Sequence, residues 1–111
     1  MAEFLISVVI NNNAKSLFGC LDSICNQTMS DMDILLIDNG TTDNSAEIIS
    51  TYAYMDNRVR TISFSKSKTL EEIKSILEKE YGETVYCIVN GDEILPVDYC
   101  EKYCDLNYLK R

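Results

Sequence analysis

Residues 33–45 of the chain read DILLIDNGTTDNS and contain the pattern that decides the fold. Their first part, Asp33–Asp38, is an apolar run of the kind found in strands that are buried on both faces. The polar loop behind it contains Gly40, which permits a left-handed backbone or a close approach. Asn44 and Glu47 then have the spacing of a helix-capping box. The stretch predicts a buried strand, a loop and the start of a helix in direct succession.

The same succession occurs four times along the chain. Apolar or alternating runs predict three further strands, at Phe4–Ile10, Val59–Phe64 and Thr84–Val89. Helical spacing of apolar residues follows each strand, over Ala14–Asn26, behind Asn44, over Leu70–Tyr81 and from Pro96 to about Tyr108. Four such units predict an α/β fold, a Rossmann-like three-layer αβα sandwich with a mainly parallel sheet of about four strands.

The third of these helices has a signal at each end. Thr69 and Glu72 form a second capping box at its start, and Gly82 is placed to end it. We therefore expect this helix to begin directly after Thr69 and to end close to Gly82.

Composition excludes several classes of function. The 111 residues include 10 Lys+Arg and 18 Asp+Glu, and this net charge of −8 argues against nucleic acid and anionic lipid as partners. No histidine is present, so His-dependent nucleophiles, imidazole bases and His zinc sites are excluded. No signal peptide is visible, and no apolar run approaches the roughly 20 residues that span a bilayer. We expect a cytoplasmic protein without a membrane segment.

The cysteines share an apolar setting and have no redox-motif spacing: Cys20, Cys25, Cys87, Cys100 and Cys104. Their odd number and the absence of CxxC predict reduced thiols that fill the core, in a reducing compartment. Cys100 and Cys104 lie one helical turn apart, which leaves a zinc site as a minor alternative.

Polar residues that follow the strands are the candidate site residues, because ligands of such sheets bind beyond the carboxyl ends of the strands. Asn11–Asn13 follow the first strand, and their amides suit a base or a ribose, although a turn with a helix cap explains them as well. Asp38 ends an apolar strand, where a carboxylate has little structural reason to be. We expect Asp38 to accept hydrogen bonds from a ligand.

The fourth strand is followed by an acidic turn, Asn90-Gly91-Asp92-Glu93. The carboxylates of Asp92 and Glu93 are hard oxygen ligands for Mg²⁺ or Mn²⁺, ions that commonly bind together with substrate phosphates. A solvated acidic turn is the alternative. Neither GxxxxGK[ST] nor GxGxxG occurs, so a P-loop nucleotide hydrolase or a dinucleotide-binding fold is not expected.

Several segments, taken in order, resemble the family 2 glycosyltransferases: Ser7–Ile10, Cys20–Thr28 (CLDSICNQT), Ile34–Ser45 (ILLIDNGTTDNS), and more loosely Asn90–Glu93 with Leu95–Tyr99. The resemblance implies the GT-A fold and an inverting, metal-dependent transfer of sugar. The implied donor is a nucleotide sugar, commonly a UDP-sugar, and the implied acceptor is a polysaccharide or another glycan.

The resemblance also implies roles for single residues. Asp38 would contact the base, and Asn90 would replace the first aspartate of the DxD motif, which usually faces the ribose. Asp92 would hold the metal that bridges to the diphosphate. The expected nucleotide-binding residues are Asn11, Asn12, Asp38, Gly40, Asn90 and Asp92, and the expected Mn²⁺ or Mg²⁺ ligands are Asp92 and Glu93.

The chain departs from the family pattern in three places. The Pro and Tyr after the first strand are missing. Lys66–Tyr81 is a charged amphipathic helix where the family has a Gly-rich stretch with an Arg-Asn pair near the donor phosphates, and no residue there matches the Arg. The acceptor-binding half with the catalytic base is not expected within residues 1–111. We interpret these residues as one donor-binding domain, truncated or naturally short, that does not transfer sugar by itself.

Two other functions remain open at this point. The first is a catalytically inactive GT-A-like module for binding or assembly. The second, from a different class, is a small α/β signalling domain with Asp38 in an acidic pocket. The absence of a lysine close to a strand end, which would pair with a phosphoacceptor, counts against the second.

Overall fold

The computed structural model describes residues 4–82 and 85–103. Strands and helices alternate along the chain: β1 (Phe4–Ile10), α1 (Leu17–Cys25), β2 (Asp33–Asn39), α2 (Ser45–Met55), β3 (Val59–Phe64), α3 (Leu70–Tyr81) and β4 (Val85–Asn90). A further helical segment begins at Tyr99 and extends through residue 103. Thr84, Cys104 and the end of the predicted last helix near Tyr108 lie outside the described residues.

The strands form one parallel sheet in the order β3-β2-β1-β4. The central strand β1 pairs with β2 on one edge and with β4 on the other, so that Val8 lies opposite both Leu36 and Val89. The prediction of a parallel, four-stranded sheet is confirmed. Because β4 lies on the far side of β1, the direction of winding reverses between these two strands, and such reversals open a crevice at the carboxyl ends of the strands.

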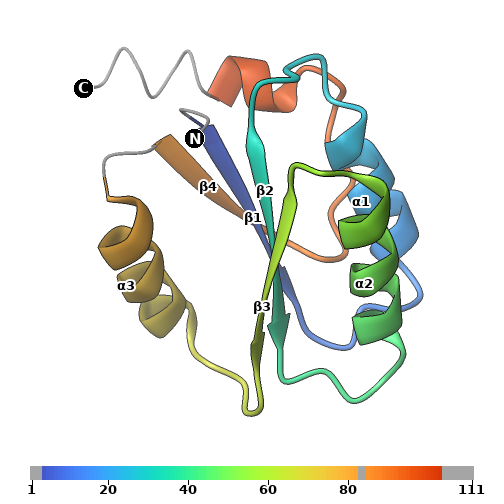
Figure 1. Ribbon diagram of the computed structural model, residues 1–111, viewed down its shortest axis with the longest axis vertical. Coiled ribbons are helices and arrows are strands. Elements are labelled where there is room, and N and C mark those ends of the chain that lie inside the picture. The colour runs from blue at the N-terminus through green and yellow to red at the C-terminus, as the bar shows by residue number, and fades with distance from the viewer. Residues whose placement is uncertain (1–3, 83–84, 104–111) are drawn as a thin grey trace.

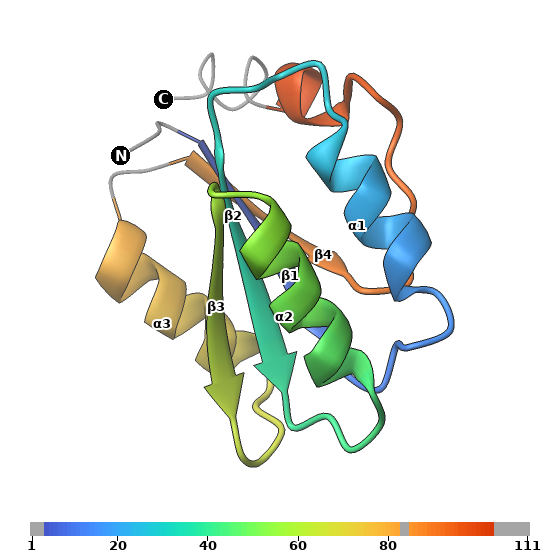
Figure 2. The same cartoon turned by 45° about the vertical axis from the view of Figure 1, so that its right-hand side comes forward.

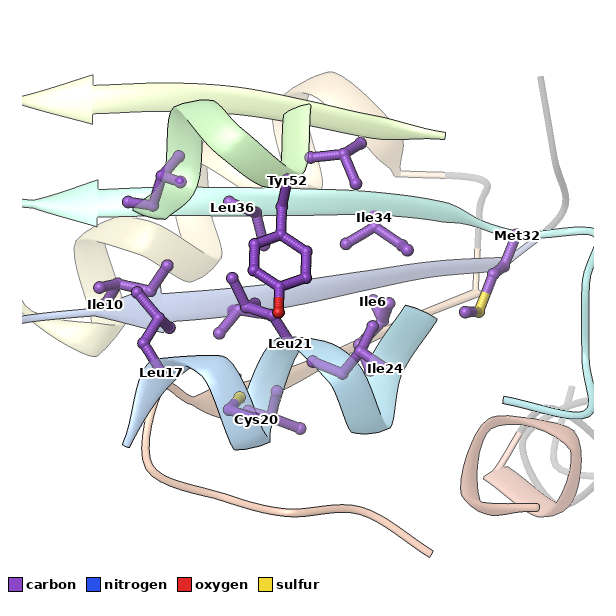
Figure 3. Close-up of a cluster of buried hydrophobic side chains, with 14 of the residues drawn as sticks. Ile6, Ile10, Leu17, Cys20, Leu21, Ile24, Met32, Ile34, Leu36 and Tyr52 are labelled. Carbon is purple, nitrogen blue, oxygen red and sulfur yellow. The ribbon is translucent and has the colours of Figure 1, made fainter. Parts of the chain in front are cut away.

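Helices cover both faces of the sheet, as predicted. Figures 1 and 2 show α1 and α2 on one face and α3 on the other. Alternate residues of the strands pack to opposite sides. On the α1/α2 side, Ile6 and Leu36 join Leu21 of α1, and Tyr52 reaches across from α2 (Figure 3). On the α3 side, a smaller cluster contains Leu5, Leu35, Ile37, Ile73 and Leu77.

The two predicted capping boxes have different outcomes. At α3 the box is present, because Glu72 N donates to Thr69 Oγ1 (3.2 Å) and Thr69 N donates to the Glu72 carboxylate (3.0 Å). At α2 the prediction is wrong, because the side chain of the N-cap residue Asn44 makes no capping hydrogen bond. Asp43 caps this helix instead and accepts from Ser45 N (2.9 Å).

The predicted start of the last helix is wrong, whereas the predicted end of α3 is confirmed. The last helix was expected to start at Pro96, but the helical segment begins at Tyr99, whose N–H donates to the Pro96 carbonyl (3.0 Å). Helix α3 ends at Tyr81, next to Gly82, as predicted. None of the helices in the described ranges has the length and apolar content needed to cross a bilayer.

The cysteines that the structure describes belong to the core, as predicted. Cys20, Cys87 and Cys100 are buried, and Cys25 is partly buried against the same cluster. Burial is the main cause that raises the pKa of Cys20 to about 12 and that of Cys25 to about 11. These thiols are therefore protonated at neutral pH.

Gln27, which follows α1, attaches the segment after β4 to this helix. Its Nε2 donates to the carbonyl oxygens of Pro96 (2.7 Å) and Ser23 (2.9 Å), and its Oε1 accepts from Cys100 N (2.8 Å). Gln27 is buried, with 7% of its surface exposed. One amide thus satisfies both a donor and acceptors of a passing backbone, which is why a glutamine suits this position.

Two neighbours of Gln27 continue this attachment. Ser23 Oγ accepts from Leu95 N (3.1 Å), and Thr28 N donates to the Val97 carbonyl (2.8 Å). Thr28 Oγ1 also donates to the carboxylate of Glu101 (2.7 Å). The polar residues within CLDSICNQT therefore hold the chain that leaves β4.

We expect Gln27→Leu to lower the free energy of unfolding by about 2 kcal/mol, because the buried N–H of Cys100 loses its acceptor and such a loss costs about 1–3 kcal/mol. Urea denaturation followed by circular dichroism measures the change. The control is Asp31→Ala at an exposed loop position, which should stay within about 0.5 kcal/mol of the native chain. Equal stabilities of the two variants would contradict the role of Gln27.

We expect Cys20 and Cys25 to react slowly with iodoacetamide in the native protein at pH 8. Because only the thiolate reacts, a pKa raised from 9.0 to about 11 lowers the reactive fraction of Cys25 about a hundredfold. Peptide mass spectrometry of the native and the urea-unfolded chain gives the two rates. Similar rates in both states would show that these thiols are not held in the core.

Candidate functional site

A cavity of about 380 Å³ opens at the carboxyl ends of the strands, where the winding reverses next to β1. Its volume lies in the range of small-molecule binding sites. Apolar side chains, four asparagine amides, one ammonium group and one carboxylate line it: Val9, Leu70, Ile73, Asn11, Asn13, Asn39, Asn90, Lys68 and Asp92. The first turn of α3 closes one side, since Leu70 and Ile73 belong to that helix.

Three of the predicted site residues meet in this cavity, namely Asn11, Asn90 and Asp92. Asn11 is exposed, and its Nδ2 donates to Ser67 Oγ (3.3 Å). Asp92 is exposed as well, and within residues 4–82 and 85–103 its carboxylate has no hydrogen-bond or salt-bridge partner. The carboxylate of Asp92 is therefore available to a ligand.

Asn12 does not line the cavity; its side chain connects two loops. Its Oδ1 accepts from Thr42 N (2.7 Å) and Asp43 N (3.2 Å), and its own backbone has a φ of 54°. Asp43 in turn accepts from Ala14 N (3.1 Å). The loop after β1 is thereby fastened to the loop before α2, which agrees with the alternative explanation of the asparagines as turn and cap residues.

Asp38 also lies outside the cavity lining and has a structural partner. One carboxylate oxygen accepts from both Thr41 N (3.0 Å) and Thr41 Oγ1 (2.6 Å), which closes the turn after β2. The expectation that a carboxylate has little structural reason to be there is therefore wrong. Strand alternation places Asp38 on the α1/α2 side with Leu36, whereas the cavity is reached from the other side.

Gly40 is required by the backbone. Its φ is 74°, a conformation that residues with a side chain rarely adopt, and a Cβ there would lie 2.8 Å from Ser67 N. Gly40 does allow a close approach of another backbone, as predicted, but the approaching segment is the loop after β3 and not a ligand.

Two lining residues, Asn39 and Lys68, were missed by the sequence analysis. Asn39 is 4% exposed; its Oδ1 accepts from Lys68 N (2.7 Å) and its Nδ2 donates to the Lys68 carbonyl (3.1 Å). Strand alternation could have indicated that Asn39, next to Asp38, faces the α3 side. No signal in the sequence brings Lys68 back to the strand ends, so the expectation of no lysine there is corrected.

The acidic turn after β4 is held from several sides. Gly91 N donates to the Val9 carbonyl (3.0 Å), and Ser16 Oγ donates to the Gly91 carbonyl (3.3 Å). A Cβ at Gly91 would lie 2.8 Å from Asn13 Oδ1, so the tight contact needs glycine. These contacts fix the backbone that presents Asp92.

The two predicted metal ligands have different surroundings. The Glu93 carboxylate turns back and accepts from Asn90 N (2.9 Å), while Asp92 lines the cavity. In the described part of the chain no group of three or more Asp, Glu or Cys side chains could hold an ion. One carboxylate does not suit a metal bound by protein alone, but it suits Mg²⁺ or Mn²⁺ held together with water and phosphate oxygens.

The model of the family described as "Glycosyl transferase family 2" matches residues 5–105 of this chain. Glycosyltransferase GlyG of Streptococcus pneumoniae serotype 4 is 36% identical over 100 residues, which cover 87% of this chain and 33% of GlyG. The chain thus spans about a third of the length of this relative.

Solved structures show the same fold. S. aureus TarS 1–349 in complex with UDP is similar with a TM-score of 0.78 and 14% identity, covering 96% of this chain and 32% of that one. The mannosyltransferase PcManGT from Pyrobaculum calidifontis, in complex with GDP-Man and Mn²⁺, is similar with a TM-score of 0.70 and 14% identity. The match covers 86% of this chain and 29% of PcManGT. The GT-A-type fold that the resemblance implied is confirmed.

The sequence segments, the parallel sheet and the similar proteins all indicate the same family. The match of the family model includes all the segments on which the resemblance was based, from Ser7–Ile10 to the acidic turn after β4. The fold of the sheet and its helices is similar to that of TarS and of PcManGT. The chain belongs to glycosyl transferase family 2.

Proposed function

We propose that residues 1–111 form the donor-binding domain of a glycosyltransferase and bind a nucleotide-diphospho-sugar, with UDP as the nucleotide part. The sugar would pass to a polysaccharide or another glycan acceptor. The observation that carries the proposal is the cavity at the strand ends, where the acidic turn after β4 presents Asn90 and Asp92 beside further amide groups. Membership of the family and the UDP bound by TarS support this choice of ligand.

The donor set of the cavity suits the parts of such a ligand. The amide of Asn11 offers both a donor and an acceptor to a base or a ribose hydroxyl. Asp92 would hold Mn²⁺ or Mg²⁺ together with the diphosphate oxygens. When bound, such an ion neutralises charge that develops on the diphosphate leaving group. Glu93 supports the turn through Asn90 N rather than facing the ion.

One carboxylate oxygen of Asp38 accepts no hydrogen bond from Thr41 and would take part in binding the ligand. Asp38 lies outside the cavity lining. The base would therefore extend from the cavity past the carboxyl end of β2, where that oxygen would accept a hydrogen bond from an N–H group at its edge. The internal contact with Thr41 holds the carboxylate in one orientation, which lowers the entropy that a ligand contact would cost.

We expect Asp38→Ala to weaken UDP binding by about 1–3 kcal/mol, the range for losing one partner of a buried hydrogen bond. Isothermal titration calorimetry in the presence of Mn²⁺ measures the affinity. Thr41→Val is the matched control, because it removes a hydroxyl contact of the same turn and leaves the carboxylate in place. If Thr41→Val costs as much as Asp38→Ala, the carboxylate acts only through the loop and the base contact is wrong.

We expect Mn²⁺ to raise the affinity for UDP about tenfold or more and Asp92→Ala to abolish this increase, because Asp92 is the carboxylate presented to the cavity. The affinity is measured by titrating UDP into each variant, once in the presence of Mn²⁺ and once in the presence of EDTA. Glu93→Gln is the matched control, since its amide oxygen still accepts from Asn90 N, and it should keep the increase. A metal effect that survives Asp92→Ala would refute the role of Asp92.

A further inference from the structure

We propose that Lys68 is the cation that binds the diphosphate group in this cavity. The inference rests on the proposed function and adds a phosphate contact that lies outside every segment on which the family resemblance is based. Lys68 precedes the capping box of α3, in the loop that returns from β3 to the strand ends.

Few charged side chains line the cavity. The described lining of the cavity contains a single basic side chain, Lys68, and a single acidic one, Asp92. The chain as a whole carries a net charge of −8, so a diphosphate that approaches it meets repulsion unless a local cation offsets it. Lys68 is placed to do this at the cavity itself.

The two charged side chains of the cavity do not form an ion pair with each other. Lys68 and Asp92 line the same cavity, yet neither of the ion pairs in the described residues includes them. Two opposite charges that face one cavity without pairing leave room for a ligand that carries both signs. A diphosphate with a divalent ion is such a ligand, because the ion would contact Asp92 and the phosphate oxygens would contact Lys68.

Hydrogen bonds hold the backbone of Lys68 at the cavity. The buried side-chain amide of Asn39 bonds both the backbone N–H and the backbone carbonyl of Lys68. Ser67 Oγ donates to the backbone carbonyl of Asn39 (3.0 Å). The glycine conformation at Gly40 allows this loop to approach closely. The Cα of Lys68 is thereby fixed at the cavity, which reduces the ordering cost of a contact made by its side chain.

The side chain of Lys68 belongs to neither ion pair of the described residues, although, after the hydrogen bonds with Thr69, its charge contributes to the lowered pKa of the exposed Glu72. Its Nζ lies 5.0 Å from the centre of the Phe64 ring, in a cation–π contact at a partly exposed position. A charge-assisted hydrogen bond to a phosphate oxygen is stronger than such a contact. The ammonium group can therefore exchange the ring for the diphosphate.

The test compares UDP with uridine on the 111-residue chain in the presence of Mn²⁺, by isothermal titration calorimetry. Lys68→Met removes the charge but keeps the apolar stem over Phe64, and Lys68→Arg keeps the charge. We expect Lys68→Met to weaken UDP binding about tenfold and to leave uridine binding within about twofold, because uridine lacks the diphosphate. Lys68→Arg should retain most of the affinity for UDP.

Lys66→Met is the matched control, since Lys66 is an exposed lysine of the same loop that does not line the cavity. It should bind UDP like the native chain, which separates a local contact from the general loss of one positive charge. Circular dichroism melts of all variants check that the fold is kept.

Three results would overturn the inference. If Lys68→Met weakens UDP and uridine equally, Lys68 supports the loop and does not contact the diphosphate. If Lys68→Met binds UDP like the native chain, the inference is wrong while the proposed function stands. If the native chain binds neither UDP nor uridine, the proposed function fails and the inference fails with it.

Discussion

The parallel pairing of β1 on both of its edges is the constraint on which the rest of the structure depends. A strand with parallel neighbours on both sides needs a crossover for each connection, and these crossovers supply the helices that cover the two faces. The neighbours of β1 in the sheet are β2 and β4, so the chain winds in opposite directions from it. The cavity lies at the carboxyl end where these directions diverge.

Amide side chains hold several of the loops and segments that connect the strands and helices. Asn12 bonds the loop before α2, Asn39 bonds Lys68 on both backbone groups, and Gln27 bonds the segment after β4. An amide carries a donor and an acceptor on a short stem, so it can pair with the N–H and the carbonyl of a passing strand or loop. Asn12 and Asn39 therefore hold loops, while Lys68 and Asp92 are the charged side chains that line the cavity.

The negative charges of the acidic turn after β4 also act on α1, where Cys20 Sγ donates to the Asn90 carbonyl (3.6 Å). After burial, the charges of Glu93 and then of Asp92 are the next largest causes that raise the pKa of Cys20, on the adjacent helix α1. A thiol at that place therefore experiences a negative potential from the turn. The same potential favours a cation beside Asp92, which is consistent with an ion that binds together with a phosphate ligand.

The sequence by itself determined the succession of strands and helices, the parallel sheet and the family, because apolar runs, helical spacing and the capping residues Thr69 and Glu72 are local properties of the chain. Only the tertiary structure decided which polar side chains face the cavity. Asp92 and Glu93 are neighbours, yet Asp92 lines the cavity while the Glu93 carboxylate accepts from Asn90 N in its own turn. Lys68 reaches the cavity, and Asp43 joins the loop after β1, through contacts with residues about 30 positions away in the chain. Such contacts depend on how separate loops meet in space, and the spacing of residues along one segment carries no information about them.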